Sequence, residues 1–196
     1  MNNNKENSIP VASFAIEGYV AAETRHWKSN ELVQRVESKN IVLNWGLDNL
    51  AKFVAGVTEA VVNGVTIDPW AITRGVIGTS STAASGTDYS ITNPAFSGAL
   101  AVNAANDGTT GLKYTSYATD SSLVRATWSY GTGDANGQSY AEVALARNNS
   151  TTFNNGSEPV TTGNNVLFSR ATHGAIAKTN DVTLSYTYDL KFKTAS

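Results

Sequence analysis

The chain has 196 residues, of which 41% are hydrophobic and only 15% are charged, and it contains no cysteine. A formal net charge of −2 provides no basic field and so argues against nucleic-acid binding, while the absence of cysteine excludes disulfides, cysteine-ligated zinc and thiol catalysis. This length is enough for one substantial hydrophobic core or two small ones.

The amino-terminal residues 1–10 are rich in asparagine and lack the charged and then apolar pattern of a signal peptide. We interpret them as a flexible or extended arm. No apolar run in the sequence approaches the roughly 20 residues that a membrane-crossing helix needs. We therefore expect synthesis in a cytoplasm and no membrane insertion.

Residues 11–43 are predicted to form a β-hairpin. Its strands should run from about Phe14 to Trp27 and from about Glu31 to Leu43, on either side of a turn at residues 28–30. A period of two is typical of a half-buried strand. The first strand shows it, because Phe14, Ile16, Gly18 and Val20 alternate with Glu17, Tyr19 and Ala21.

One helix is predicted, over residues 44–56. Asn44 is a candidate N-cap and Gly56 a candidate residue just beyond the carboxyl end. Asp48 is expected in the first turn, where a negative charge suits the helix dipole. The spacing i, i+3, i+4, i+7 predicts one apolar stripe, formed by Leu47, Leu50, Ala51 and Val54.

Residues 65–196 are rich in predicted strands, at 70–78, 99–103, 112–118, 123–130, 140–147, 166–171 and 182–192. Polar or small-residue loops are expected at 79–87, 131–137 and 148–165. Many short strands separated by such loops favour an antiparallel β-sandwich. We predict a single mainly β domain over residues 11–196; a boundary, if there is one, should lie near residues 56–63.

The last predicted strand, residues 182–192, alternates the most regularly of all. Apolar side chains from Val182 to Phe192 occupy every second position, and polar side chains lie between them. This pattern places Tyr186 and Leu190 in the core. Thr187 and Asp189 should then face solvent or a partner subunit.

The sequence shows no convincing catalytic or metal-binding pattern. His26 and His173 are far apart in the chain, and residues 131–137 lack the G-K-[ST] ending of a phosphate loop. Asp134 and Asn136 resemble the start of a calcium loop, but no Glu follows at its twelfth position. We therefore predict no catalytic residue, no metal and no cofactor.

The four tryptophans, Trp27, Trp45, Trp70 and Trp128, allow two interpretations. Exposed aromatic rings stack on sugar faces, whereas tryptophan is highly buried on average. We favour core or interface positions for them. Carbohydrate binding remains the alternative, and an exposed Trp or Tyr in a groove would favour it.

Five motif segments occur in an order that resembles a group of tailed-bacteriophage structural proteins, called tail, collar, head-fibre or minor virion proteins. The segments are Lys39–Leu50 (KNIVLNWGLDNL), Ile72–Thr79 with the small-residue loop after it, Ala126–Trp128, Tyr140–Leu145, and Leu167–Ala171 followed by Ile176–Thr179. Ala144 stands where those proteins often have glycine. None of the segments is catalytic, so the resemblance depends on their order.

The resemblance implies a non-enzymatic virion component that acts by assembling with copies of itself, as a trimer or ring, and with neighbouring virion proteins. For the assembly interface we select Ile9, Val11, Phe14, Trp27 and Trp70. The arm should anchor the protein, while the loops at 131–137 and 148–165 should face outward. The alternative is a carbohydrate-binding adhesin or receptor-binding module for a host-surface glycan; a hydrolase is a third possibility, which converging carboxylates in a deep pocket would favour.

Overall fold

The computed structural model describes residues 14–55, 60–62, 65–67, 72, 74–88, 91, 94–99, 111–116, 121–148 and 165–194. The described chain is mainly β, with one short helix. Its elements are β1 (Phe14–His26), β2 (Leu32–Val42), α1 (Asn44–Val54), β3 (Ala60–Val62), β4 (Val65–Ile67), β5 (Arg74–Gly78), β6 (Pro94–Ala99), β7 (Gly111–Ser116), β8 (Ser121–Tyr130), β9 (Gln138–Asn148), β10 (Asn165–Lys178) and β11 (Val182–Thr194).

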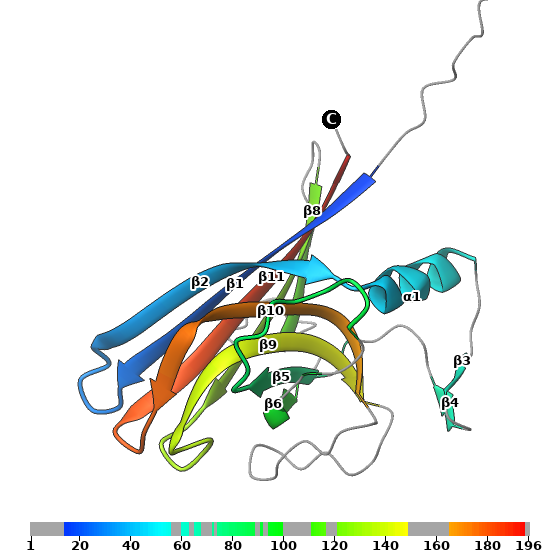
Figure 1. The fold of residues 1–196 in the computed structure, drawn as a ribbon. Coiled ribbons are helices and arrows are strands. Elements are labelled where there is room, and N and C mark those ends of the chain that lie inside the picture. Colours follow the sequence, from blue (N-terminus) through cyan, green and yellow to red (C-terminus); the bar gives the residue numbers. More distant parts are fainter. Residues whose placement is uncertain are drawn as a thin grey trace, which may run out of the picture.

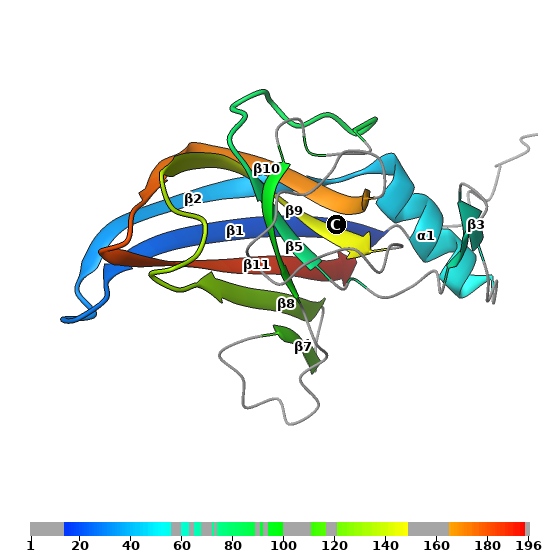
Figure 2. The same ribbon diagram turned by 90° about the horizontal axis from the view of Figure 1, so that it is seen from below.

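Nine strands form one sheet in the order β6-β5-β9-β10-β2-β1-β11-β8-β7, and every pair is antiparallel. β3 and β4 pair separately with each other. In Figures 1 and 2 the sheet curls, so that β9 and β10 arch across the inner face of β1 and β11. The mainly β, antiparallel prediction is confirmed. The β-sandwich is not, because a single curled sheet forms a half-barrel.

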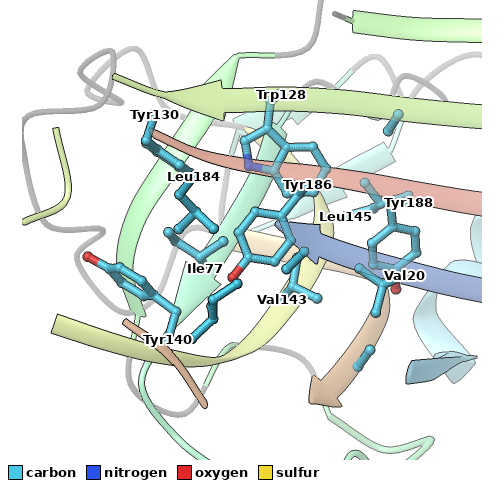
Figure 3. Close-up of a cluster of buried hydrophobic side chains, with 14 of the residues drawn as sticks. Val20, Ile77, Trp128, Tyr130, Tyr140, Val143, Leu145, Leu184, Tyr186 and Tyr188 are labelled. Atoms are coloured by element: carbon cyan, nitrogen blue, oxygen red, sulfur yellow. The ribbon is translucent and has the colours of Figure 1, made fainter. Parts of the chain in front are cut away.

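The core fills the concave side of this half-barrel. Figure 3 shows side chains from β8 and β11 meeting side chains from β5 and β9. The rings of Trp128 and Tyr186 stack with centroids 5.3 Å apart. Opposite them, a Cβ on Gly75 would lie 2.4 Å from the Trp128 ring. The strands β2, β1, β11, β8 and β7 form the outer arm of the curled sheet, and β6, β5, β9 and β10 form the inner arm. The two arms of the sheet therefore pack in direct contact, and glycine at position 75 makes room for the indole.

β11 lies at the centre of the outer arm, between β1 and β8. Its side chains alternate as the sequence predicts. Tyr186 and Leu190 are buried, while Thr187 and Asp189 lie on the opposite face with partial exposure. This confirms the predicted facing of the last strand.

β2 and β10 meet along a seam with few backbone pairs. Among the described residues, their ladder consists of Val42 with Ser169 and Ile41 with Arg170. Farther along, two side chains bridge the strands: Gln34 Nε2 donates to the Ala175 carbonyl at 2.8 Å, and Ser38 Oγ donates to the Thr172 carbonyl at 2.6 Å. The hairpin thus joins the two arms of the sheet partly through side chains.

The predicted hairpin is confirmed, but details of the helix prediction are wrong. The Leu43 carbonyl accepts the first helical hydrogen bond, from Leu47 N–H, so Leu43 and not Asn44 is the capping residue. Leu43 is the buried residue that links β2 to α1, and Asn44 N–H donates to the Gly86 carbonyl at 2.8 Å. No acidic residue lies in the first turn, so Asp48 falls beyond it.

The apolar stripe of α1 is not the face that packs on the sheet. Leu47 is 45% exposed and Val54 is 81% exposed. The helix instead approaches β10 at buried Gly46, where a Cβ would lie 2.2 Å from the Phe168 carbonyl oxygen. Only a residue without a side chain allows this approach, and it turns the stripe outward.

Other strand bounds shift from their predicted positions. β6 lies at 94–99, while residues 100–103 of the strand predicted at 99–103 lie outside the described residues. β10 continues to residue 178 instead of ending at 171. The arm at 1–10, and residues 149–164 of the predicted loop, lie outside the described residues. No helix in the described ranges is long and apolar enough to cross a membrane.

Candidate binding groove and buried ion network

An open groove of about 610 Å³ lies on the outer face of β2, β1, β11 and β8, on the side of the sheet away from the core. We call it the outer-face groove. Its lining comes almost entirely from side chains that alternate with core residues along the four strands. They are Tyr19, Ala21, Glu23, Arg35, Glu37, Lys39, Arg125, Ser185, Thr187 and Asp189; Val20 and Ser38, a pair on the opposite face, complete the lining.

The strand register arranges this lining in cross-strand rows. One row is Lys39, Tyr19, Asp189 and Arg125, from β2 across to β8. The middle row is Glu37, Ala21 and Thr187, and the next is Arg35, Glu23 and Ser185. The small side chains of Ala21, Ser185 and Thr187 therefore form the floor, with Tyr19 and the charged side chains around them.

Ion pairs hold the charged groups of the groove at both walls. Arg125 donates from Nε and Nη2 to the two Asp189 oxygens, each at 2.7 Å. On the other wall, Arg35 Nε donates to Glu37 at 2.8 Å, and Arg35 also pairs with Glu23. The hydrogen bond with Glu37 raises the pKa of Arg35 above its usual value. These ion pairs hold both arginines and their carboxylate partners in place within the protein itself.

Tyr19 is the large aromatic side chain of the groove, and it is 44% exposed. Its position on β1 follows from alternation, because neighbouring Val20 is buried in the core. Its cross-strand neighbours are Lys39 and Asp189. Ring surface is therefore available beside positioned charged groups.

A second feature is a buried ion network centred on Arg170, on the face of β9 and β10 turned away from the main core. This guanidinium donates to Glu142 Oε2 at 3.1 and 2.7 Å and to Asp88 Oδ2 at 2.7 Å. It also donates to the Thr82 carbonyl at 3.0 Å. Arg170 and Glu142 are almost fully buried. The network fastens the irregular segment 79–88 onto β9 and β10.

Three of the motif segments identified in the sequence meet at this network, and a fourth lies alongside it. Glu142 belongs to the Tyr140–Leu145 segment and Arg170 to the Leu167–Ala171 segment. The loop after the Ile72–Thr79 segment provides the carbonyls and Asp88. The Lys39–Leu50 segment lies alongside, since Leu43 N–H donates to the Phe168 carbonyl at 3.0 Å. In this chain Arg170 and Glu142, both within motif segments, join the segment 79–88 to β9 and β10.

Of the residues predicted for an assembly interface, the structure describes only Phe14 and Trp27, and these two lie far apart. Phe14 is 59% exposed and Trp27 is 53% exposed, but they lie at opposite ends of β1. A strand of this length separates them by about 40 Å. Ile9, Val11 and Trp70 lie outside the described residues.

The other predicted candidates are placed as follows. Trp128 is buried, as expected. His173 lies against Tyr186, with Nε2 3.3 Å from its hydroxyl, whereas His26 lies at the hairpin turn, where Ser29 Oγ approaches its Nδ1 at 3.4 Å. The loop at 131–137 is largely exposed, although Ala135 is buried. The described residues hold no cluster of three or more His, Asp or Glu that could bind a metal.

Sequence reasoning missed both the outer-face groove and the ion network. For the groove, a signal existed in β1, whose outward positions 19, 21 and 23 mix aromatic, small and acidic side chains. For the network, Glu142 stands out as an acidic residue within an otherwise apolar run, Tyr140–Ala146. A charge inside such a run predicts a buried partner. The sequence alone does not identify that partner.

Comparison with known proteins identifies no relatives: no protein family, no curated protein and no solved structure matches this chain.

Proposed function

We propose that this protein is a non-enzymatic structural component of a tailed-phage virion that acts through protein–protein assembly. The sequence resemblance suggests the virion. The observation that supports assembly through protein–protein contacts is the location of the exposed apolar side chains. Among the described residues, six of the eight large exposed hydrophobic side chains lie on the β1–β2 hairpin, namely Phe14, Tyr19, Trp27, Leu32, Val33 and Ile41.

Three of these residues gather at the turn of the hairpin, which we call the hairpin tip: Trp27, Leu32 and Val33. The tip is a fixed structure, because Trp27 N–H donates to the Asp181 carbonyl at 3.1 Å and Asn30 N–H donates to the His26 carbonyl at 2.8 Å. Burying one such side chain contributes about 1.5–3 kcal/mol. A preformed apolar tip therefore favours docking onto a neighbouring subunit.

The first partner proposed for the tip is another copy of this chain, in a symmetric trimer or ring, with other virion proteins alongside. Light scattering during size-exclusion chromatography of the purified protein tests this. We expect an oligomer whose mass falls towards the monomer in Val33→Lys. The matched control is Val54→Lys, which places the same charge at an exposed valine of α1 and should leave the mass unchanged. A monomeric wild type at high concentration, or equal effects of both substitutions, contradicts assembly through the tip.

Location in the virion needs a separate test. Antibodies raised against the purified chain should label particles released from a lysed bacterial culture that produces it, and mass spectrometry of those particles should detect the chain. If gradient-purified particles lack the chain while the soluble lysate contains it, the virion proposal is wrong. Deleting residues 2–10 tests the predicted anchor: the variant should fold but fail to enter particles.

A further inference from the structure

We propose that the outer-face groove is a binding site for an uncharged saccharide. This goes beyond assembly through the hairpin tip, and it assigns a ligand class to a surface that contains none of the tip residues. The volume of about 610 Å³ lies within the range of ligand sites, roughly 300–1,000 Å³.

The charges of the groove select against a charged ligand. The lining holds three cations, Arg35, Lys39 and Arg125, and three anions, Glu23, Glu37 and Asp189. Their formal charges cancel. Both Arg125 with Asp189 and Arg35 with its two glutamates are already paired within the protein. A phosphate, a uronic acid or an acidic peptide would have to compete with these pairs, whereas a neutral ligand would not.

The same ion pairs suit a ligand rich in hydroxyl groups. A carboxylate offers about four acceptor positions. The Arg125 fork occupies two at Asp189, with one bond to each oxygen. A sugar hydroxyl both donates and accepts, so adjacent hydroxyls can bond to a carboxylate and to the cation beside it. Groups already held in place lose little freedom on binding.

Tyr19 supplies the apolar contact that a sugar ring requires. One face of many pyranose rings is lined by C–H groups, which pack against an aromatic ring and leave the hydroxyls at the edge. Tyr19 lies in the row with Lys39 and Asp189, so the ring and the charged groups can contact one sugar together. Ala21 and Thr187 in the next row are small enough to leave the floor open.

The lining distinguishes a saccharide from a protein partner. Centres of protein–protein interfaces are apolar and depleted in charge. The outer-face groove has the opposite composition, with six charged side chains around one aromatic ring. The apolar surface of the hairpin is instead concentrated at the tip. Polar groups beside a single exposed ring are typical of recognition of a hydroxylated ligand.

Binding can be tested on the purified full chain with defined hexasaccharides. Neutral probes are maltohexaose, cellohexaose, chitohexaose and mannohexaose; acidic probes are hexagalacturonate and a heparin hexasaccharide. We expect at least one neutral probe to bind by calorimetry and to shift the backbone amide NMR signals of Ala21, Ser185 and Thr187. No binding by any neutral probe, tighter binding of an acidic probe, or shifts confined to other surfaces would overturn the proposal.

Variants then test the residues. Tyr19→Ala should weaken the bound probe at least about tenfold, and Asp189→Asn should weaken it about five- to tenfold. Leu47→Ala is the matched control, because it removes a large apolar side chain of similar exposure on α1 and should change affinity less than about twofold. Equal losses in Tyr19→Ala and Leu47→Ala would refute the assignment. The amide shifts in the wild type give a test that needs no substitution.

Discussion

Glu142 on β9 and Arg170 on β10 form a doubly hydrogen-bonded ion pair in the interior, with both side chains almost completely removed from solvent. Such a pair is costly to desolvate, so its effect on stability depends on whether both partners are present. Here the guanidinium also binds Asp88 and two carbonyls of the segment 79–88. One side chain therefore couples two strands to an irregular segment.

Removing the positive charge of Arg170 should strongly destabilise the folded protein. In Arg170→Met the Glu142 carboxylate stays buried without its counter-charge, and we expect a loss of about 3–5 kcal/mol in the free energy of unfolding. Glu142→Leu should cost less, because Asp88 still pairs with Arg170 at 2.7 Å. Urea unfolding of the two single variants and of the double variant measures the coupling free energy between Arg170 and Glu142. We expect the double variant to be more stable than Arg170→Met, and simple addition of the two losses would contradict this account.

The ion pair of Arg125 with Asp189 offers a comparison of nearly equal geometry at the surface. Its two hydrogen bonds are 2.7 Å long, but the side chains are 46% and 22% exposed. Solvent screens this interaction, so Asp189→Asn should lower the free energy of unfolding by no more than about 1 kcal/mol. The loss should shrink further at high salt. A loss as large as that of Arg170→Met would mean that exposure does not set the difference.

Gly75→Ala should destabilise the contact between the two arms of the sheet. The added Cβ would lie 2.4 Å from the Trp128 ring, a distance at which one group must move. Overpacking of this kind costs about 1–3 kcal/mol, measurable by thermal or urea unfolding. Gly133→Ala is the control, because a Cβ there meets nothing within 4 Å. If Gly75→Ala and Gly133→Ala lose the same free energy of unfolding, β5 does not pack on the Trp128 indole as described.

Alkaline pH should unfold the protein through its core tyrosines. Burial raises the pKa of Tyr130, Tyr140, Tyr186 and Tyr188 above the usual value near 10. Below pH 10 both folded and unfolded states keep these protons, and stability is complete. Above it the unfolded state loses them first, so stability falls by about 1.4 kcal/mol per pH unit for each tyrosine.

Urea midpoints measured across the alkaline range, together with phenolate absorbance, check this. Ionisation of the four tyrosines should coincide with unfolding. Tyr188→Phe should have a stability that falls less steeply with pH, by about 1.4 kcal/mol per unit. Equal slopes in the variant and the wild type would show that Tyr188 ionises without unfolding.

The sequence predicts the strands well because a period of two depends only on which face of a strand is buried. Both β1 and β11 follow it. Alternation is identical in a sandwich and in a curled sheet, so it does not distinguish between them. For α1 the sequence pattern misleads. The apolar stripe predicts which face of the helix packs on the sheet, but the close approach at Gly46 decides which face meets β10.

The sites are harder to predict because they depend on register between strands distant in sequence. Tyr19 and Asp189 become neighbours through the pairing of β1 with β11, 170 positions along the chain. Glu142 and Arg170 meet across β9 and β10 in the same way. Single-sequence patterns report the facing of each side chain but not its neighbour on the next strand.

The side-chain bridges between β2 and β10 have a consequence for folding and motion. A full backbone ladder would hold these strands at a fixed spacing and twist, whereas the Gln34 and Ser38 bonds reach across a wider separation. The half-barrel therefore bends where its peptide groups pair least. Amide hydrogen exchange should be fastest along this line among the long strands, and the two arms should open from it as separate cooperative units. Substitutions at positions 34 and 38 would then change the curvature of the sheet without touching its core.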